Sequence, residues 1–220
     1  MQSNDELRRN VKEELAWEPQ LDPEAIAVSA EDGRVTLRGT VGSPREKRAA
    51  TNAAQRVFGV VAVDNKLEVR LLNERRRDDA DLRADVLQAL MLNSLVPSTV
   101  DVNVDHGLVT LTGTANWNHQ RIEAERVAST VVGTVEVLDE IELYHLPNPD
   151  PDAVEDAITR ALRRSAALDA RKLHVSTSSG TVTIKGHVRS WAEHDDAIAA
   201  AWAAPGVKDV HDLIVVDYDL

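Results

Sequence analysis

Cysteine is absent from the sequence, which excludes disulfides and thiolate chemistry. No hydrophobic run approaches the roughly 20 apolar residues that a membrane-spanning helix needs. The first residues, from Met1 to Arg9, also lack the apolar stretch of a signal peptide. We therefore expect a cytoplasmic protein if residue 1 is the true start, and a periplasmic protein if a signal peptide has been removed.

Basic residues are too few to balance the acidic ones. The 25 Lys and Arg stand against 37 Asp and Glu, for a formal net charge of -12. An acidic chain gains nothing from counterion release on a polyanion, so nucleic acid is excluded as a general partner. The excess of acid is largest between residues 75 and 147.

The sequence motifs of enzymes and metal sites are also missing. No glycine-rich phosphate loop and no Asp-x-Asp-x-Asp-Gly calcium loop occur in the sequence. Four of the histidines gather near the C-terminus, but no two have the i, i+4 spacing of a helical zinc pair: His174, His187, His194 and His211. We predict surface histidines, no metal, no cofactor and a non-enzymatic protein.

One stretch recurs three times along the chain. Its centre reads Gly-x-Val-x-Leu-x-Gly in the first copy, from Gly33 to Gly39, and returns at offsets of 74 and then 73. Nine of the ten glycines keep this register, which indicates backbone requirements more than ligand contacts: Gly33, Gly39, Gly59, Gly107, Gly113, Gly133, Gly180, Gly186 and Gly206. The pattern predicts three domains, residues 1–74, 75–147 and 148–220.

Each copy has the periodicity of a helix, two strands, a second helix and a third strand. In the first copy Leu7, Val11 and Leu15 have helical spacing, and a short turn joins two alternating runs into a hairpin. The fold class is therefore α+β, with three tandem αββαβ units. Each unit should be a small three-stranded mixed sheet with two helices on one face. The other face is polar, either solvated or used for contacts between copies, and carries Thr36, Arg38, Thr110, Thr112, Thr183 and Lys185.

Local signals set the boundaries of these elements. Ser3, Ser43 and Ser190 each begin a capping box, and Asp150 is a good N-cap. The glycines at 59, 133 and 206 should end the second helices in the left-handed conformation. Asn65 is a polar residue in the otherwise apolar face of the third strand, which favours a bulge or a strand end. The charge run 75–79 is interpreted as a solvated linker and helix start, and the prolines of 147–151 as a stiff connector.

The repeated pattern resembles the BON domain, a bacterial module associated with osmotic stress and nodulation. The pattern continues after the hairpin with Ser43, a helix with spaced alanines, Gly59-Val60 and then Val63-x-Asn65-x-Leu67. The resemblance covers nearly the whole chain in three units. It implies a binding module linked to envelope integrity, osmotic stress and phospholipid or membrane surfaces, with no catalytic residues.

The candidate binding surface consists of the few features that oppose the overall charge, with two tryptophans at the starts of second helices. The alternative interpretation of the basic residues is a solvated helix face, and that of the tryptophans is a packing role. Trp17 and Trp202 are interpreted as core or interface between copies. The candidate residues are Arg45, Lys47, Arg48, Arg56, Trp117 and Trp191.

Two functions remain open from the sequence. One is a stress- or envelope-associated protein that binds a phospholipid surface, and the other is a cytosolic protein-interaction scaffold without lipid binding. Units of about 73 residues are near the lower limit for a self-sufficient core, so we expect the copies to pack on one another.

Overall fold

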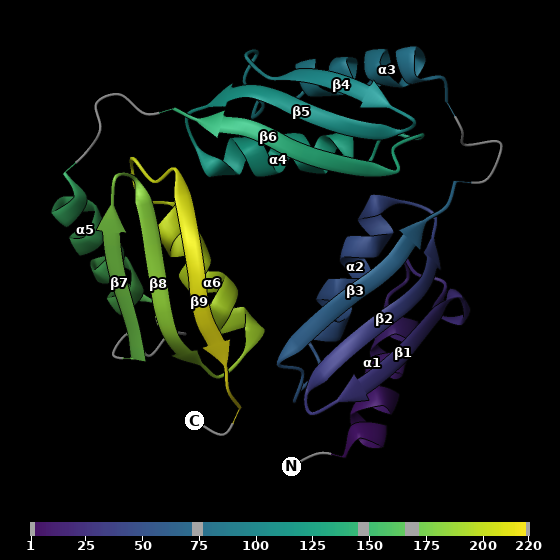
Figure 1. Cartoon of the computed structure of the whole chain (residues 1–220), viewed down its shortest axis with the longest axis horizontal. Coiled ribbons are helices and arrows are strands. Elements are labelled where there is room, and N and C mark those ends of the chain that lie inside the picture. Colours follow the sequence, from purple (N-terminus) through teal and green to yellow (C-terminus); the bar gives the residue numbers. More distant parts are fainter. Residues whose placement is uncertain (1–2, 72–76, 145–149, 166–171, 219–220) are drawn as a thin grey trace. The chain divides into compact units, whose positions relative to one another are not determined.

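The computed structural model describes residues 3–71, 77–144, 150–165 and 172–218. Within these ranges the chain forms six α-helices and nine strands, and the strands make three separate three-stranded sheets (Figure 1). The predicted α+β class and the order of elements in each repeat are confirmed. Residues 75 and 76 of the predicted linker, and Pro147 and Pro149 of the predicted connector, lie outside the described residues.

The first repeat has a short 3-10 turn, Pro23–Ala25, before its first strand. Its regular elements are α1 (Asn4–Trp17), β1 (Ile26–Glu31), β2 (Arg34–Val41), α2 (Pro44–Gln55) and β3 (Ala62–Val69).

The second and third repeats follow the same order. The second consists of α3 (Asp79–Met91), β4 (Asp101–Asp105), β5 (Leu108–Ala115), α4 (Asn118–Ala128) and β6 (Glu136–Leu143). The third consists of α5 (Pro151–Arg164), β7 (Leu173–Ser178), β8 (Thr181–Val188), α6 (Trp191–Trp202) and β9 (Asp209–Val216).

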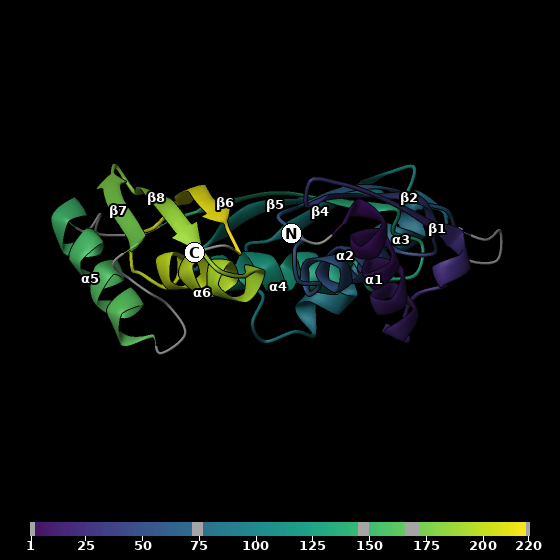
Figure 2. The ribbon, with the colours of Figure 1, turned by 90° about the horizontal axis from the view of Figure 1, so that it is seen from below.

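Every sheet is mixed, as the sequence predicts. In the first, β1 pairs antiparallel with β2, placing Val28 opposite Leu37, and β3 pairs parallel with β2 on its other side. The two helices of each repeat cover one face of its sheet and leave the other open (Figure 2). The predicted bulge or strand end at Asn65 is wrong, because β3 runs through Asn65 in continuous register.

Serine and aspartate side chains fix where the helices begin. The Ser43 hydroxyl accepts a hydrogen bond from the Glu46 backbone N–H at 3.2 Å, and the Glu46 carboxylate accepts one from Gly42 N–H at 2.8 Å. Ser190 caps α6 in the same way, and Asp150 caps α5 through Asp152 N–H. These caps satisfy backbone donors that have no partner inside the helix.

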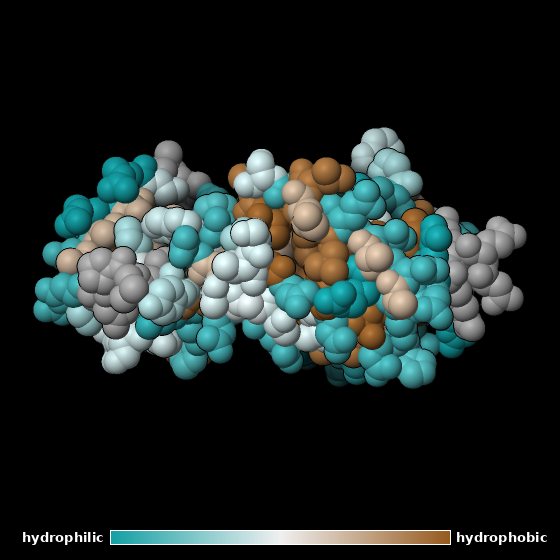
Figure 3. Space-filling view, turned by 90° about the horizontal axis from the view of Figure 1, so that it is seen from above, coloured by the Kyte–Doolittle hydropathy of each residue, from teal (hydrophilic) through white to brown (hydrophobic). Residues whose placement is uncertain are grey.

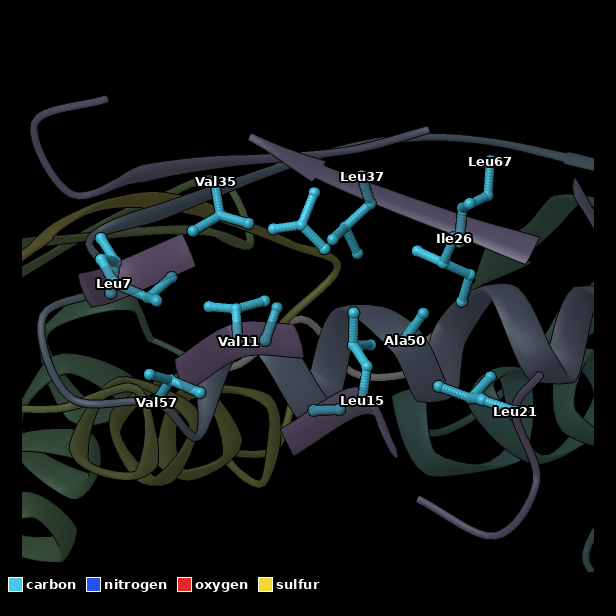
Figure 4. Close-up of a cluster of buried hydrophobic side chains, with 14 of the residues drawn as sticks. Leu7, Val11, Leu15, Leu21, Ile26, Val35, Leu37, Ala50, Val57 and Leu67 are labelled. Carbon is cyan, nitrogen blue, oxygen red and sulfur yellow. The ribbon is translucent and has the colours of Figure 1, made fainter. Parts of the chain in front are cut away.

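The core of each repeat lies between its helices and its sheet. Leu37, Leu111 and Ile184 are equivalent positions at the centre of the middle strands, and each has 0% of its surface exposed, which confirms the predicted register. Figure 4 shows Leu7, Val11 and Leu15 of α1 facing the strands of the first sheet. Alanine at 50, 53 and 54 is fully buried and brings α2 close to the sheet.

The repeated glycines meet two backbone requirements. Gly59, Gly133 and Gly206 have φ of 90°, 112° and 85°, so the predicted left-handed conformation is confirmed, although each lies in the turn that follows its helix. Gly39 and its equivalents let the middle strand pass a backbone carbonyl. A Cβ at Gly39 would lie 2.0 Å from the carbonyl oxygen of Ala25.

Candidate functional site

The predicted basic residues of the first repeat do not share one helix face. Arg45 and Lys47 lie about 200° apart around α2, since successive helical residues are about 100° apart. Arg45 and Arg48 are exposed, whereas Lys47 is half-buried and its carbonyl oxygen accepts a hydrogen bond from Asn65 Nδ2 at 2.8 Å. Their role in binding remains a prediction.

Arg56 caps the end of α2 and points toward α1. Its Nε lies 2.8 Å from Glu14 Oε1, and its Nη2 lies 3.4 Å from Glu18 Oε2. The hydrogen bond with Glu14 is the main reason that the pKa of Arg56 is raised. Two carboxylates of the same repeat therefore offset this charge.

The predicted tryptophans are half-buried. Trp191 packs against the core of the third repeat, and its ring meets the His194 ring edge-to-face at 4.9 Å. Trp202 packs on the same core, and Trp117 is half-buried at the start of α4. The core interpretation of Trp17 is wrong, because 83% of its surface is exposed at the end of α1.

A group of exposed apolar side chains lies where α3 ends. The exposed fractions of Met91, Leu92 and Leu95 are 85%, 81% and 53%. Figure 3, which looks onto the side of the second repeat that carries α3, shows hydrophobic side chains gathered at the surface. We call these three residues the apolar segment. The helical periodicity of the sequence indicates this exposure, because Met91 and Leu92 fall outside the buried stripe of Leu82, Val86 and Leu90.

A polar network holds the backbone of the apolar segment in place. Asn93 Oδ1 accepts a hydrogen bond from Leu95 N–H at 2.9 Å, and Asn93 Nδ2 donates to Glu123 Oε1 at 2.6 Å. Arg126 donates to both oxygens of Glu123, at 2.7 and 2.6 Å. The Arg126 hydrogen bonds, followed by that of Asn93, lower the pKa of Glu123 to about 2. The segment is therefore anchored from α4.

Asp79, Asp105 and His106 bring three potential metal-ligand atoms within 4.8 Å of one another. Asp79 accepts hydrogen bonds from the backbone N–H groups of His106 and Gly107, at 2.8 and 3.0 Å, which lowers its pKa. In the first repeat Asn4 accepts the equivalent bond from Asp32 N–H at 3.0 Å. The contact therefore fastens a helix start to a hairpin turn, and a metal is not needed to explain it.

The position of Asn65 ties the third strand to the second helix in every repeat. Asn65 donates to the Thr51 hydroxyl at 2.7 Å in the first repeat. Its equivalent Asp139 lies 3.1 Å from Arg121 Nε, although burial raises the Asp139 pKa more than this arginine lowers it. In the third repeat, Asp212 Oδ2 lies 2.6 Å from His194 Nε2. A polar residue at this position is thus a structural tie.

These observations define a tandem-repeat α+β protein with exposed apolar and charged surfaces. None of the helices in the described ranges is long and apolar enough to cross a membrane. The chain belongs to the BON domain family, whose model matches residues 3–70, 78–143 and 150–218.

One curated relative and two solved structures resemble the chain. Osmotically-inducible protein Y of Escherichia coli (strain K12) is 32% identical over 140 residues, which cover 60% of this chain and 70% of that protein. CdsD, a structural protein of the type III secretion system of Chlamydia trachomatis, is 13% identical with a TM-score of 0.28. The match covers 95% of this chain and 91% of the CdsD chain. The structure of the CdsD C-terminal domain is 13% identical with a TM-score of 0.27, and the match covers 98% of this chain and 99% of that chain. Neither structure is similar enough to carry an argument.

Proposed function

We propose that the chain is a non-enzymatic binding protein that attaches to phospholipid surfaces through the apolar segment of its second repeat. The supporting observation is the exposure of Met91, Leu92 and Leu95 on an anchored backbone. Apolar side chains held at the surface in a group are typical of a contact site for a membrane or a partner.

The proposed association is apolar in origin, with electrostatics secondary. Burying one large apolar side chain gains about 1.5–3 kcal/mol, so three of them supply at most about 4–9 kcal/mol. A basic residue near an anionic surface adds about 1 kcal/mol. The net charge of -12 opposes anionic lipid, so Arg45 and Arg48 contribute little overall. The affinity would lie between millimolar and micromolar.

Vesicle co-sedimentation tests this proposal. We expect the protein to sediment with vesicles of neutral phosphatidylcholine as well as with vesicles containing anionic phosphatidylglycerol, and to remain bound in high salt. Replacing Met91 and Leu92 by Glu should abolish binding, since charged side chains are costly to bury. Gln88→Glu, at an exposed position of the same helix, is the control and should leave binding unchanged.

Absence of sedimentation with both kinds of vesicle would contradict the lipid proposal. Binding to anionic vesicles alone would instead favour the basic residues as the binding surface. Such binding should be lost in high salt and in the double variant Arg45→Glu with Arg48→Glu. If no vesicle is bound, the protein-interaction scaffold is the better function, with the apolar segment facing a protein.

A role in osmotic stress is the second part of the proposal, and it rests on the name of the Escherichia coli relative. We expect the amount of this protein to rise after an osmotic upshift of the source cell. Quantitative immunoblotting before and after the upshift would check this, and an unchanged level would contradict it.

A further inference from the structure

Sulfur is scarce in this chain. The sequence has no cysteine and two methionines, Met1 and Met91, of which Met91 lies in the described ranges. Peroxides oxidise the sulfur of thiolates and of thioethers. A peroxide that meets this chain therefore reacts with methionine sulfur without competition from a thiol.

Met91 is open to an oxidant dissolved in water. It is the last residue of α3, and 85% of its surface is exposed. The buried stripe of that helix consists of Leu82, Val86 and Leu90 instead. A thioether has no proton to lose, so access to the sulfur decides whether it is oxidised. The side chain of Met91 meets this condition and lies outside the core.

Backbone hydrogen bonds hold the chain around Met91 at the surface. Leu92 N–H donates to the Gln88 carbonyl oxygen at 3.1 Å. Asn93 N–H donates to the Leu90 carbonyl oxygen at 3.0 Å. Both bonds join main-chain atoms, so a reaction at the Met91 sulfur leaves them intact. Oxidation therefore changes the chemistry of the apolar segment and keeps the segment in place.

We propose that Met91 is a site of reversible oxidation to methionine sulfoxide, and that this oxidation releases the chain from a phospholipid surface. The proposal rests on the attachment proposed above, in which Met91, Leu92 and Leu95 enter that surface. The oxidant is a peroxide, and hydrogen peroxide is the simplest member of this class.

The reaction transfers an oxygen atom to sulfur. A lone pair of the Met91 sulfur attacks one oxygen of hydrogen peroxide, and the S–O bond forms as the O–O bond breaks. The departing hydroxide takes the proton from the transferred oxygen and leaves as water. Sulfur loses two electrons, and the peroxide gains them. A methionine sulfoxide reductase reverses the change, since the sulfoxide oxygen leaves as water while two thiols become a disulfide.

Oxidation turns the contribution of Met91 to attachment from favourable to unfavourable. The thioether is apolar and gains free energy when it leaves water. The sulfoxide oxygen accepts hydrogen bonds from water and finds no donor among acyl chains. The apolar segment has three large apolar side chains, so the loss of one is a large share of the whole. We expect the apparent dissociation constant for neutral vesicles to rise at least about tenfold.

Co-sedimentation of the whole protein with phosphatidylcholine vesicles, before and after treatment with hydrogen peroxide, tests the proposal. Mass spectrometry of proteolytic peptides locates the added oxygen, and circular dichroism checks that the fold is unchanged. We expect oxygen on the peptide that contains Met91, weaker binding, and recovery of binding after treatment with the reductase and a thiol. Vesicles present during the treatment should slow oxidation of Met91, because polar hydrogen peroxide is scarce among acyl chains.

Three variants separate Met91 from other targets of the oxidant. Met91→Leu removes the sulfur and keeps an apolar side chain of similar size. Whatever the affinity of this variant, peroxide should leave it unchanged, although Trp17, also oxidisable, is 83% exposed. Met91→Gln, which imitates the neutral polar sulfoxide, should bind as weakly as the oxidised protein. Met91→Leu with Lys12→Met moves the methionine to an exposed position of α1, where its oxidation should not weaken binding.

The proposal is overturned if protein oxidised at Met91 binds as tightly as untreated protein, if peroxide weakens binding of Met91→Leu to the same extent, or if Met91 takes up no oxygen. Each of these outcomes leaves the lipid attachment standing. An untreated protein that binds neither neutral nor anionic vesicles would instead remove the lipid attachment, and this proposal with it.

Discussion

At the scale of single residues, Gly39 occupies a position where a side chain is poorly tolerated, as do its equivalents Gly113 and Gly186. The φ of Gly39 is 134°, and a Cβ would lie 2.0 Å from the Ala25 carbonyl oxygen, which is backbone and cannot move aside easily. We expect Gly39→Ala to lower the free energy of unfolding of the first repeat by about 2 kcal/mol or more. Urea denaturation measures this cost.

Gly42→Ala is the control for this substitution, since Gly42 is absent from the residues of positive φ. It should change the free energy of unfolding by less than about 1 kcal/mol. Equal effects of the two substitutions would show that the close approach to Ala25 does not matter.

The glycines also show how much of the structure can be predicted from the sequence. Their fixed offsets predict a backbone requirement and the positions of the strands, because a repeated pattern averages out local ambiguity. The sequence could not distinguish a left-handed turn at Gly59 from close packing at Gly39. That distinction depends on Ala25, which belongs to another part of the fold.

At the scale of the elements, α3 and α4 are joined through Asn93, Glu123 and Arg126. The folded pKa of Glu123, about 2, lies below its usual value of 4.5. The stabilising contribution of the ionised carboxylate is therefore complete above about pH 4.5 and is lost as the pH falls through about 2. A carboxyl NMR titration should show this low pKa.

Substitution of each partner should raise the Glu123 pKa in a definite order. Arg126→Ala should raise it more than Asn93→Ala, because the arginine is the larger cause of the shift. An unshifted Glu123 in the unmodified protein, or the reverse order, would mean that the network does not hold the apolar segment in solution.

The same elements explain why the candidate site was only partly predictable. Helical periodicity correctly placed Leu82, Val86 and Leu90 in the core. Periodicity could not reveal that Glu14 and Glu18 neutralise Arg56, because those residues come from another helix. The interpretation of Trp17 as a core residue is wrong, since helix α1 buries Leu7, Val11 and Leu15 and turns Trp17 outward. The alternative, that Trp17 lies at an interface between copies, stays a prediction.

At the scale of the whole molecule, the buried clusters bear on how independent the repeats are. The cluster of the first repeat draws its members from residues 7–67, and that of the third from residues 154–216. Each of these repeats therefore has helices, a sheet and a core of its own. The expectation that the copies also bury apolar surface against one another stays a prediction.

An excised third repeat, residues 148–220, tests both statements together. Because its core is complete, we expect a cooperatively melting domain, with a free energy of unfolding of about 3–10 kcal/mol from its size. Because a small core leaves little margin, any packing against the other repeats should make its melting temperature higher in the whole chain. Circular dichroism of the fragment and calorimetry of the whole protein measure the two temperatures. A fragment without a cooperative transition would mean that the third core needs its neighbours, whereas identical temperatures would show that the repeats fold as independent units.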